Sequence, residues 1–146
     1  MLHASFLGLV TLAKVGGTPE AAHGELMRFF AEAAWYPTAL LPSQGVKWEE
    51  VDGSSAKATL SDGQVKVTLL IQFNGKGLME SARCESRGRA TASGVIPTPW
   101  EGRVSHYEQV NGVCIPLEAE AAWILPQGRK PYWRGRITEL SYEFAK

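Results

Sequence analysis

The sequence predicts an α+β fold that is mostly β: a curved, half-barrel-like antiparallel meander sheet packed around one amphipathic helix in the N-terminal half. Two observations predict this class. Helical periodicity is confined to one stretch, residues 19–35. From residue 46 onward, apolar and polar residues alternate between short turns. Because these turns join successive strands as hairpins, we expect an antiparallel sheet.

The helix has a clear start and a clear end. Thr18 supplies a hydroxyl N-cap, Pro19 suits the first helical position, and Glu20 faces the positive end of the helix dipole. One apolar stripe recurs at helical spacing, formed by Ala22, Leu26, Phe29, Phe30 and Ala33. Since the residue before Pro37 avoids helical geometry, the helix should end near Trp35, before a short turn at "TALLP".

About seven or eight strands are expected. An apolar run at 4–13 predicts a buried strand at the start of the chain. The others are predicted on either side of the turns "DGSS", "SDG" and "NGKG", and at 103–110, 113–125 and 132–144, the last three linked by "NG" and "PQGRKP". The segment "ATASGVIPTPWEG", 90–102, is expected to be irregular.

Alternation divides the strand after "NGKG" into two faces. One face is expected to carry Met79, Ser81, Arg83, Glu85, Arg87 and Arg89. The other face is expected to carry Leu78, Ala82 and Cys84.

Composition fits one globular domain, 1–146, because 146 residues with 45% hydrophobic content can bury a single core. Fifteen basic residues balance fifteen acidic ones, so there is no electrostatic footprint for nucleic acid or an anionic membrane. Cys84 and Cys114 lack metal-ligand spacing and are interpreted as small buried hydrophobes.

The N-terminal apolar run does not resemble a signal peptide, since it lacks a basic segment before it and Lys14 follows it. No run approaches the roughly 20 apolar residues of a membrane helix, so no transmembrane segment is expected. This chain is therefore expected to be cytoplasmic. A longer native N-terminus would leave the location open.

Familiar catalytic motifs are not found. The sequence has no phosphate-binding glycine loop between strand and helix, no GxSxG and no HExxH. The histidines His3, His23 and His106 fall on different predicted elements and have no paired carboxylate at ligand spacing. We therefore predict no metal site, no cofactor and no catalytic residue.

One charged cluster on the helix has two interpretations. Glu25, Arg28 and Glu32 lie at i, i+3 and i+7 and project from one face. They could position a polar substrate, and a buried carboxylate there could transfer protons. Acid and base at these spacings are also typical of a solvated helix face, where each pair contributes about 0.2–0.5 kcal/mol.

Aromatic residues form a second constellation, interpreted either as core or as the lining of an apolar pocket. The segments "PTPWEGR" and "PYWRGR" both place an arginine near an aromatic ring and a glycine, and Arg103, Arg134 and Arg136 could stack on rings or hold a carboxylate. A ligand with an acidic head and an apolar body would suit this chemistry. The candidate ligand-binding residues are Glu25, Arg28, Phe29, Glu32, Trp35, Tyr36, Trp48, Trp100, Arg103, Trp133 and Arg134.

The segments "GELMRFFAEAAWYPTALLPSQGVKW", "PTPWEGR", "IPLEAEAAWILP" and "PYWRGRIT" together resemble a family of uncharacterised bacterial proteins known as a domain of unknown function. The resemblance covers nearly the whole chain. It implies that this chain corresponds to the C-terminal portion of longer members, which carry a further strand-rich segment upstream of "FLGLV". The order of helix and strands is similar to that of LolA-like lipoprotein carriers, which enclose apolar ligands in an incomplete barrel.

Three functions follow as hypotheses. The first is a noncatalytic module that binds an apolar or lipid-like ligand in the groove between helix and sheet. The second is a hydrolase or isomerase that uses Glu25 or Glu32 with Arg28, and the third is an interaction module without a small-molecule site. If upstream strands are missing, an open sheet edge would recruit another chain, so a homodimer through that edge is also expected.

Overall fold

The computed structural model describes residues 18–142, so the predicted strand at 4–13 lies outside the described residues. The helix α1 spans Pro19–Ala31, and the Thr18 hydroxyl accepts a hydrogen bond from the Ala21 amide. Three short 3₁₀ turns follow, at Glu32–Trp35 (η2), Pro37–Leu40 (η3) and Pro42–Gln44 (η4). The predicted helix start is confirmed, and the helical path ends at Trp35, as the following Tyr36–Pro37 step predicts.

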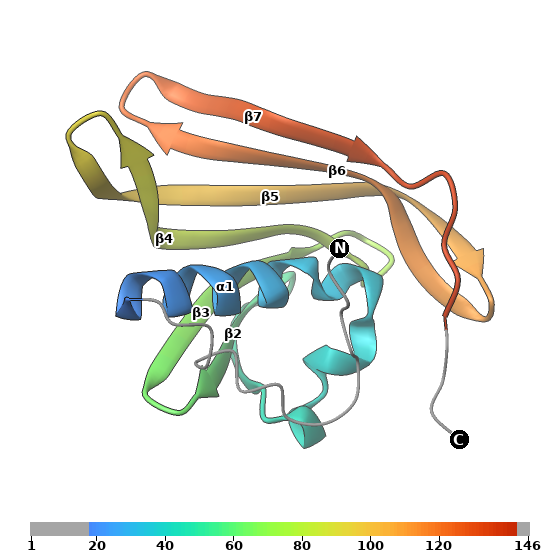
Figure 1. Ribbon diagram of the computed structural model, residues 1–146. Coiled ribbons are helices and arrows are strands. Elements are labelled where there is room, and N and C mark those ends of the chain that lie inside the picture. The colour runs from blue at the N-terminus through green and yellow to red at the C-terminus, as the bar shows by residue number, and fades with distance from the viewer. Residues whose placement is uncertain (1–17, 143–146) are drawn as a thin grey trace.

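Seven strands form one antiparallel sheet in chain order, and the sheet does not close into a barrel (Figure 1). The strands are Lys47–Asp52 (β1), Ser55–Asp62 (β2), Val65–Phe73 (β3), Met79–Thr91 (β4), Gly94–Val110 (β5), Val113–Leu125 (β6) and Gly128–Arg136 (β7). This order confirms the predicted α+β class and the meander.

Two boundaries differ from the prediction. The segment 90–102 is regular: β4 and β5 form a long hairpin through it. Pro97 and Pro99 are tolerated because this part of β5 pairs with β4 alone, and Pro99 lies opposite a bulge. The last strand spans Gly128–Arg136 instead of 132–144, since the turn before it is only Pro126 and Gln127.

The core lies between α1 and the first strands of the sheet. Leu26, Met27 and Phe30 are buried at 3%, 0% and 1% exposure. They belong to one apolar cluster with the buried side chains of the sheet, which include Val67, Leu69, Ile71, Ala82 and Cys84. In Figure 1, α1 runs beside β3 and β4, whereas β6 and β7 lie farther from it, beyond β5. The helix therefore covers only part of one face of the sheet.

Two bulges in β4 decide which of its side chains face the helix. We call the face that carries Ala82 and Cys84 the helix-side face, and the opposite one the outer face. Cys84 pairs with Trp100, but Arg87 pairs with Thr98, because two residues of β4 oppose one of β5 between these pairs. Thr98 and Trp100 lie two apart on one strand and so share a face.

The predicted division of β4 is therefore wrong at three residues. Arg87 and Arg89 lie on the helix-side face beyond the second bulge. Met79 also lies there, because a first bulge shifts the register beside Phe73. The strand bends sharply part-way along its length (Figure 1).

The outermost strands of the described sheet are β1 and β7. β7 carries Arg129, Lys130, Pro131, Arg134 and Arg136, residue types that natural proteins place on edges to prevent unwanted pairing. The homodimer through a sheet edge stays a prediction. In the described part of the chain, no helix is long and apolar enough to span a membrane.

Candidate functional site

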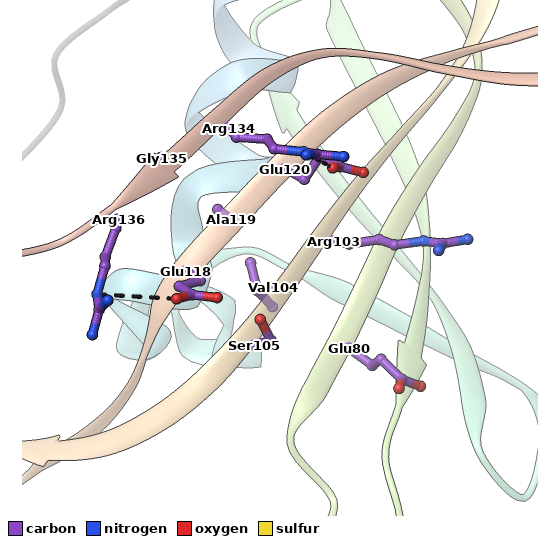
Figure 2. Close-up of a pocket in the computed structure, with 10 residues that line it drawn as sticks. All are labelled: Glu80, Arg103, Val104, Ser105, Glu118, Ala119, Glu120, Arg134, Gly135 and Arg136. Atoms are coloured by element: carbon purple, nitrogen blue, oxygen red, sulfur yellow. Dashed lines mark hydrogen bonds and ion pairs between the residues drawn. The ribbon is translucent and has the colours of Figure 1, made fainter.

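The outer face of β5 to β7 carries a ladder of ion pairs, part of which Figure 2 shows. Arg103 contacts Glu101 at 2.6 Å, and Arg129 contacts the same carboxylate at 2.7 Å. Further along, Arg134 pairs with Glu120, and Arg136 lies 4.0 Å from Glu118. Arg103, Glu118, Glu120, Arg134 and Arg136 also line a shallow pocket on this face. The charges of this face neutralise one another.

Glu120 is the centre of the ladder. Hydrogen bonds from Arg129 and then Arg134 lower the pKa of this carboxyl below its ordinary value. A lowered carboxyl pKa stabilises the fold above the ordinary pKa, and that contribution is lost as pH falls through the folded value. The carboxylate is thus held ionised by arginines of its own chain.

The two W-x-G-R segments share one geometry. In each, the tryptophan lies over the glycine two residues later, since a Cβ on Gly102 would stand 2.7 Å from Trp100, and one on Gly135 2.5 Å from Trp133. Both rings lie on the helix-side face: Gly102 on β5 and Trp133 on β7 both pair with Ala121 on β6, and Trp100 lies two residues from Gly102 on the same strand. The intervening residue and the final arginine join the ladder on the outer face.

The helix-side face beyond α1 carries an aromatic platform, which we define as Trp100, Trp123, Tyr132 and Trp133. The rings of Trp123 and Tyr132 stack with centroids 5.4 Å apart and planes 20° apart. The indole nitrogen of Trp100 donates a hydrogen bond to the Tyr132 hydroxyl at 2.8 Å. Side-chain contacts across β5, β6 and β7 therefore hold Trp100, Trp123 and Tyr132 together.

Arg87 lies against the platform. Its guanidinium carbon is 5.1 Å from the ring centroid of Trp100 and 5.8 Å from that of Trp123. Its Nη1 donates to the Tyr132 hydroxyl at 3.4 Å. Arg89, two residues on, donates from Nε to the hydroxyl of the buried Thr98 at 3.3 Å. The platform therefore has an arginine pair at one side.

Tyr132 and Trp133 are 50% and 48% exposed. An aromatic side chain that contacts water to this extent does not contribute its full apolar area to the core. Trp100, by contrast, is 5% exposed and forms the buried part of the platform. The platform thus has a buried base and an accessible surface.

One family model matches residues 1–142, and its description is "Family of unknown function (DUF6920)". The chain belongs to this family. The predicted membership of an uncharacterised family is thereby confirmed, whereas the likeness to LolA-like carriers stays a prediction. No curated protein and no solved structure matches the chain.

In this family member, the charged cluster on α1 and η2 faces water. Arg28 donates to Glu32 at 2.9 Å, with side chains 56% and 39% exposed, and Glu25 is also exposed. The two acids and the guanidinium form a solvated helix face of the kind that contributes little to stability. As candidate site residues these three stay predictions.

The aromatic candidates near the helix end bind backbone carbonyls. The Trp35 indole donates to the Pro116 carbonyl at 3.0 Å, and the Trp48 indole donates to the Leu40 carbonyl at 2.9 Å. The Tyr36 hydroxyl donates to the Phe29 carbonyl at 2.8 Å, and burial raises the pKa of this phenol. These three side chains and that of Phe29 are only partly exposed. The contacts of Trp35 and Trp48 join the helix end to the sheet.

The remaining candidates are divided between the two faces. Trp100 and Trp133 belong to the platform, whereas Arg103 and Arg134 belong to the ladder on the outer face. The arginines that contact or adjoin the platform are instead Arg87 and Arg89, which the unbroken alternation placed on the wrong face. The bulge has no clear signal in the sequence.

Among the described residues, no cluster of His, Cys, Asp and Glu could hold a metal ion.

Proposed function

We propose that this protein is a noncatalytic binding module for an apolar or lipid-like ligand. The ligand lies on the aromatic platform, on the part of the helix-side face that α1 leaves uncovered. The observation that carries the proposal is that Tyr132 and Trp133 are half exposed on the face that elsewhere forms the core. Exposed apolar surface next to a core is typical of ligand-binding or partner surfaces.

The platform supports this proposal better than the predicted groove between helix and sheet. Side chains already fill the space beneath α1, where Met27, Leu69 and Ile71 are 0% exposed. Phe29 and Trp48 pack against the same cluster. A ligand at that interface would have to displace core residues, whereas the platform is accessible without rearrangement.

The proposal does not extend to catalysis. Arg28 pairs with Glu32 in an exposed ion pair and Glu25 is exposed, so these residues lack the buried surroundings that activate a catalytic acid or base. The third hypothesis, an interaction module, differs from the proposal only in the size of the occupant. A small apolar probe distinguishes the two.

Binding of decanol, a neutral amphiphile, tests the proposal. We expect saturable binding that changes the tryptophan fluorescence of the folded protein. Trp133→Ala should weaken this binding about tenfold, because an indole that buries apolar area against the ligand contributes well over 1 kcal/mol. The circular dichroism spectrum of the variant should be unchanged, since Trp133 is half exposed.

Leu41→Ala is the matched control, because Leu41 is also a large apolar side chain at 49% exposure but lies far from the platform, between η3 and η4. It should bind decanol as the parent protein does. Equal weakening by the two variants, or the absence of saturable binding, would contradict the proposal.

A further inference from the structure

We infer that the ligand of the platform is an oxyanion with an apolar body, and that Arg87 and Arg89 receive its head group. This inference rests on the proposed function and deepens it by naming the class of ligand. The shared chemistry is that of a carboxylate or a phosphate monoester. The inference rests on the arrangement of the arginines, which is an observation independent of the exposed aromatic surface.

The arginines of the chain fall into two sets. Six of the eight pair with a glutamate: Arg28, Arg83, Arg103, Arg129, Arg134 and Arg136. Arg87 and Arg89 form no ion pair with any carboxylate of residues 18–142. They are also the arginines that share the face of the platform. The arginines that pair with no carboxylate of the described residues thus lie together beside the apolar surface.

Both side chains are only partly exposed, so their charges are screened less than those of surface lysines. They lie two residues apart on one face and repel each other. The rings of Trp100 and Trp123 hold Arg87 in place, and a cation over an aromatic ring is stabilised only modestly. An anion between the two guanidinium groups would remove this repulsion.

The two guanidinium groups also have hydrogen-bond donors to spare. Each carries five N–H groups. Arg87 donates to Tyr132 and Arg89 to Thr98 within the described chain. Among the described residues, the buried side-chain nitrogen without a partner is Nη2 of Arg129, on the outer face. No nitrogen of Arg87 or Arg89 is both buried and unpaired, so their unused N–H groups are accessible. Guanidinium groups with free N–H edges match the oxygens of a carboxylate or phosphate.

The position of the pair relative to the platform sets the orientation of the ligand. Arg87 contacts Trp100, Trp123 and Tyr132, so the head group lies at the β4 side of the platform. The apolar body then extends across Trp123 and Tyr132 toward Trp133 on β7. A single-chain amphiphile with an anionic head satisfies both parts.

Three decyl amphiphiles test the inference: decanoate, decyl phosphate and decanol, with decyltrimethylammonium as the cationic control. Decanoate or decyl phosphate should bind at least about tenfold more tightly than decanol, because charge-assisted hydrogen bonds add over 1 kcal/mol. Added salt should reduce this preference. Whichever of the two anions binds more tightly identifies the head group. The cationic amphiphile should bind more weakly than decanol.

Arg89→Gln should remove most of the preference for the anion and leave decanol affinity unchanged, since the hydrogen bond of Arg89 is to Thr98, which is not part of the platform. Arg87→Gln should have the same effect on the anion, with circular dichroism confirming that the fold is retained. Arg83→Gln is the matched control, because Arg83 lies on the same strand but faces outward and pairs with Glu85 at 2.7 Å. It should bind all probes as the parent protein does.

The outcomes separate the two proposals. Decanol binding with no preference for either anion, or an equal loss of preference in Arg83→Gln, overturns this inference and leaves the proposed function standing. If none of the amphiphiles binds, both are overturned.

Discussion

Replacing Phe30 by alanine is expected to lower the free energy of unfolding by about 3–5 kcal/mol. Phe30 is 1% exposed and lies in the cluster that joins α1 to the sheet. Its removal leaves a cavity that neighbouring strands cannot close without disturbing their pairing. The loss is measured by urea denaturation followed by circular dichroism, with the slope of the transition checked for constancy.

Arg28→Ala is the control for this substitution, because it lies two residues away on the exposed face of the same helix. Its ion pair with Glu32 is exposed, so we expect a change of about 0.5 kcal/mol or less. If Phe30→Ala lowered the free energy of unfolding as little as Arg28→Ala does, α1 would not be packed against the sheet through Phe30.

Gly102→Ala is expected to destabilise the protein by about 1–3 kcal/mol, the range for an added methyl group in a packed core. The new Cβ would stand 2.7 Å from Cη2 of Trp100, and the ring is 5% exposed. The ring cannot move aside easily, because its nitrogen donates to Tyr132 and Arg87 lies against it. Displacing Trp100 should also disturb the base of the platform.

Gly135→Ala makes the same chemical change in the second W-x-G-R segment. There the new Cβ would stand 2.5 Å from Trp133, but this ring is 48% exposed and can swing into water. We expect a loss of less than about 1 kcal/mol, since alanine also suits a strand better than glycine does. If urea denaturation showed equal destabilisation by the two variants, the burial of Trp100 would not explain the loss of unfolding free energy in Gly102→Ala.

The fold class could be predicted from periodicity because α1 and most strands follow their intrinsic patterns. Thr18 and Pro19 mark the start of the helix, and the Tyr36–Pro37 step marks its end. The hairpin between β4 and β5 was not predictable in the same way. Pro97 and Pro99 normally argue against a strand, and they are accommodated because this part of β5 has no second neighbour and Pro99 lies opposite a bulge.

The candidate site was predictable in its aromatic part and not in its charged part. The similarity of "PTPWEGR" and "PYWRGR" points to Trp100 and Trp133, and both rings belong to the platform. The arginines of the same segments point the other way, since consecutive strand residues alternate between faces. Arg87 reaches the platform only because of a bulge, a tertiary feature that a single sequence does not encode in its period.

The indole N–H signals of the tryptophans in a ¹H–¹⁵N correlation spectrum test the central claim most directly. On titration with decanoate, we expect the signals of Trp123 and Trp133 to shift, because these rings belong to the platform. The signals of Trp35 and Trp48 should stay in place, since both indoles donate hydrogen bonds to backbone carbonyls outside the platform. Shifts confined to Trp35 and Trp48 would contradict the account and place the ligand at the helix end instead.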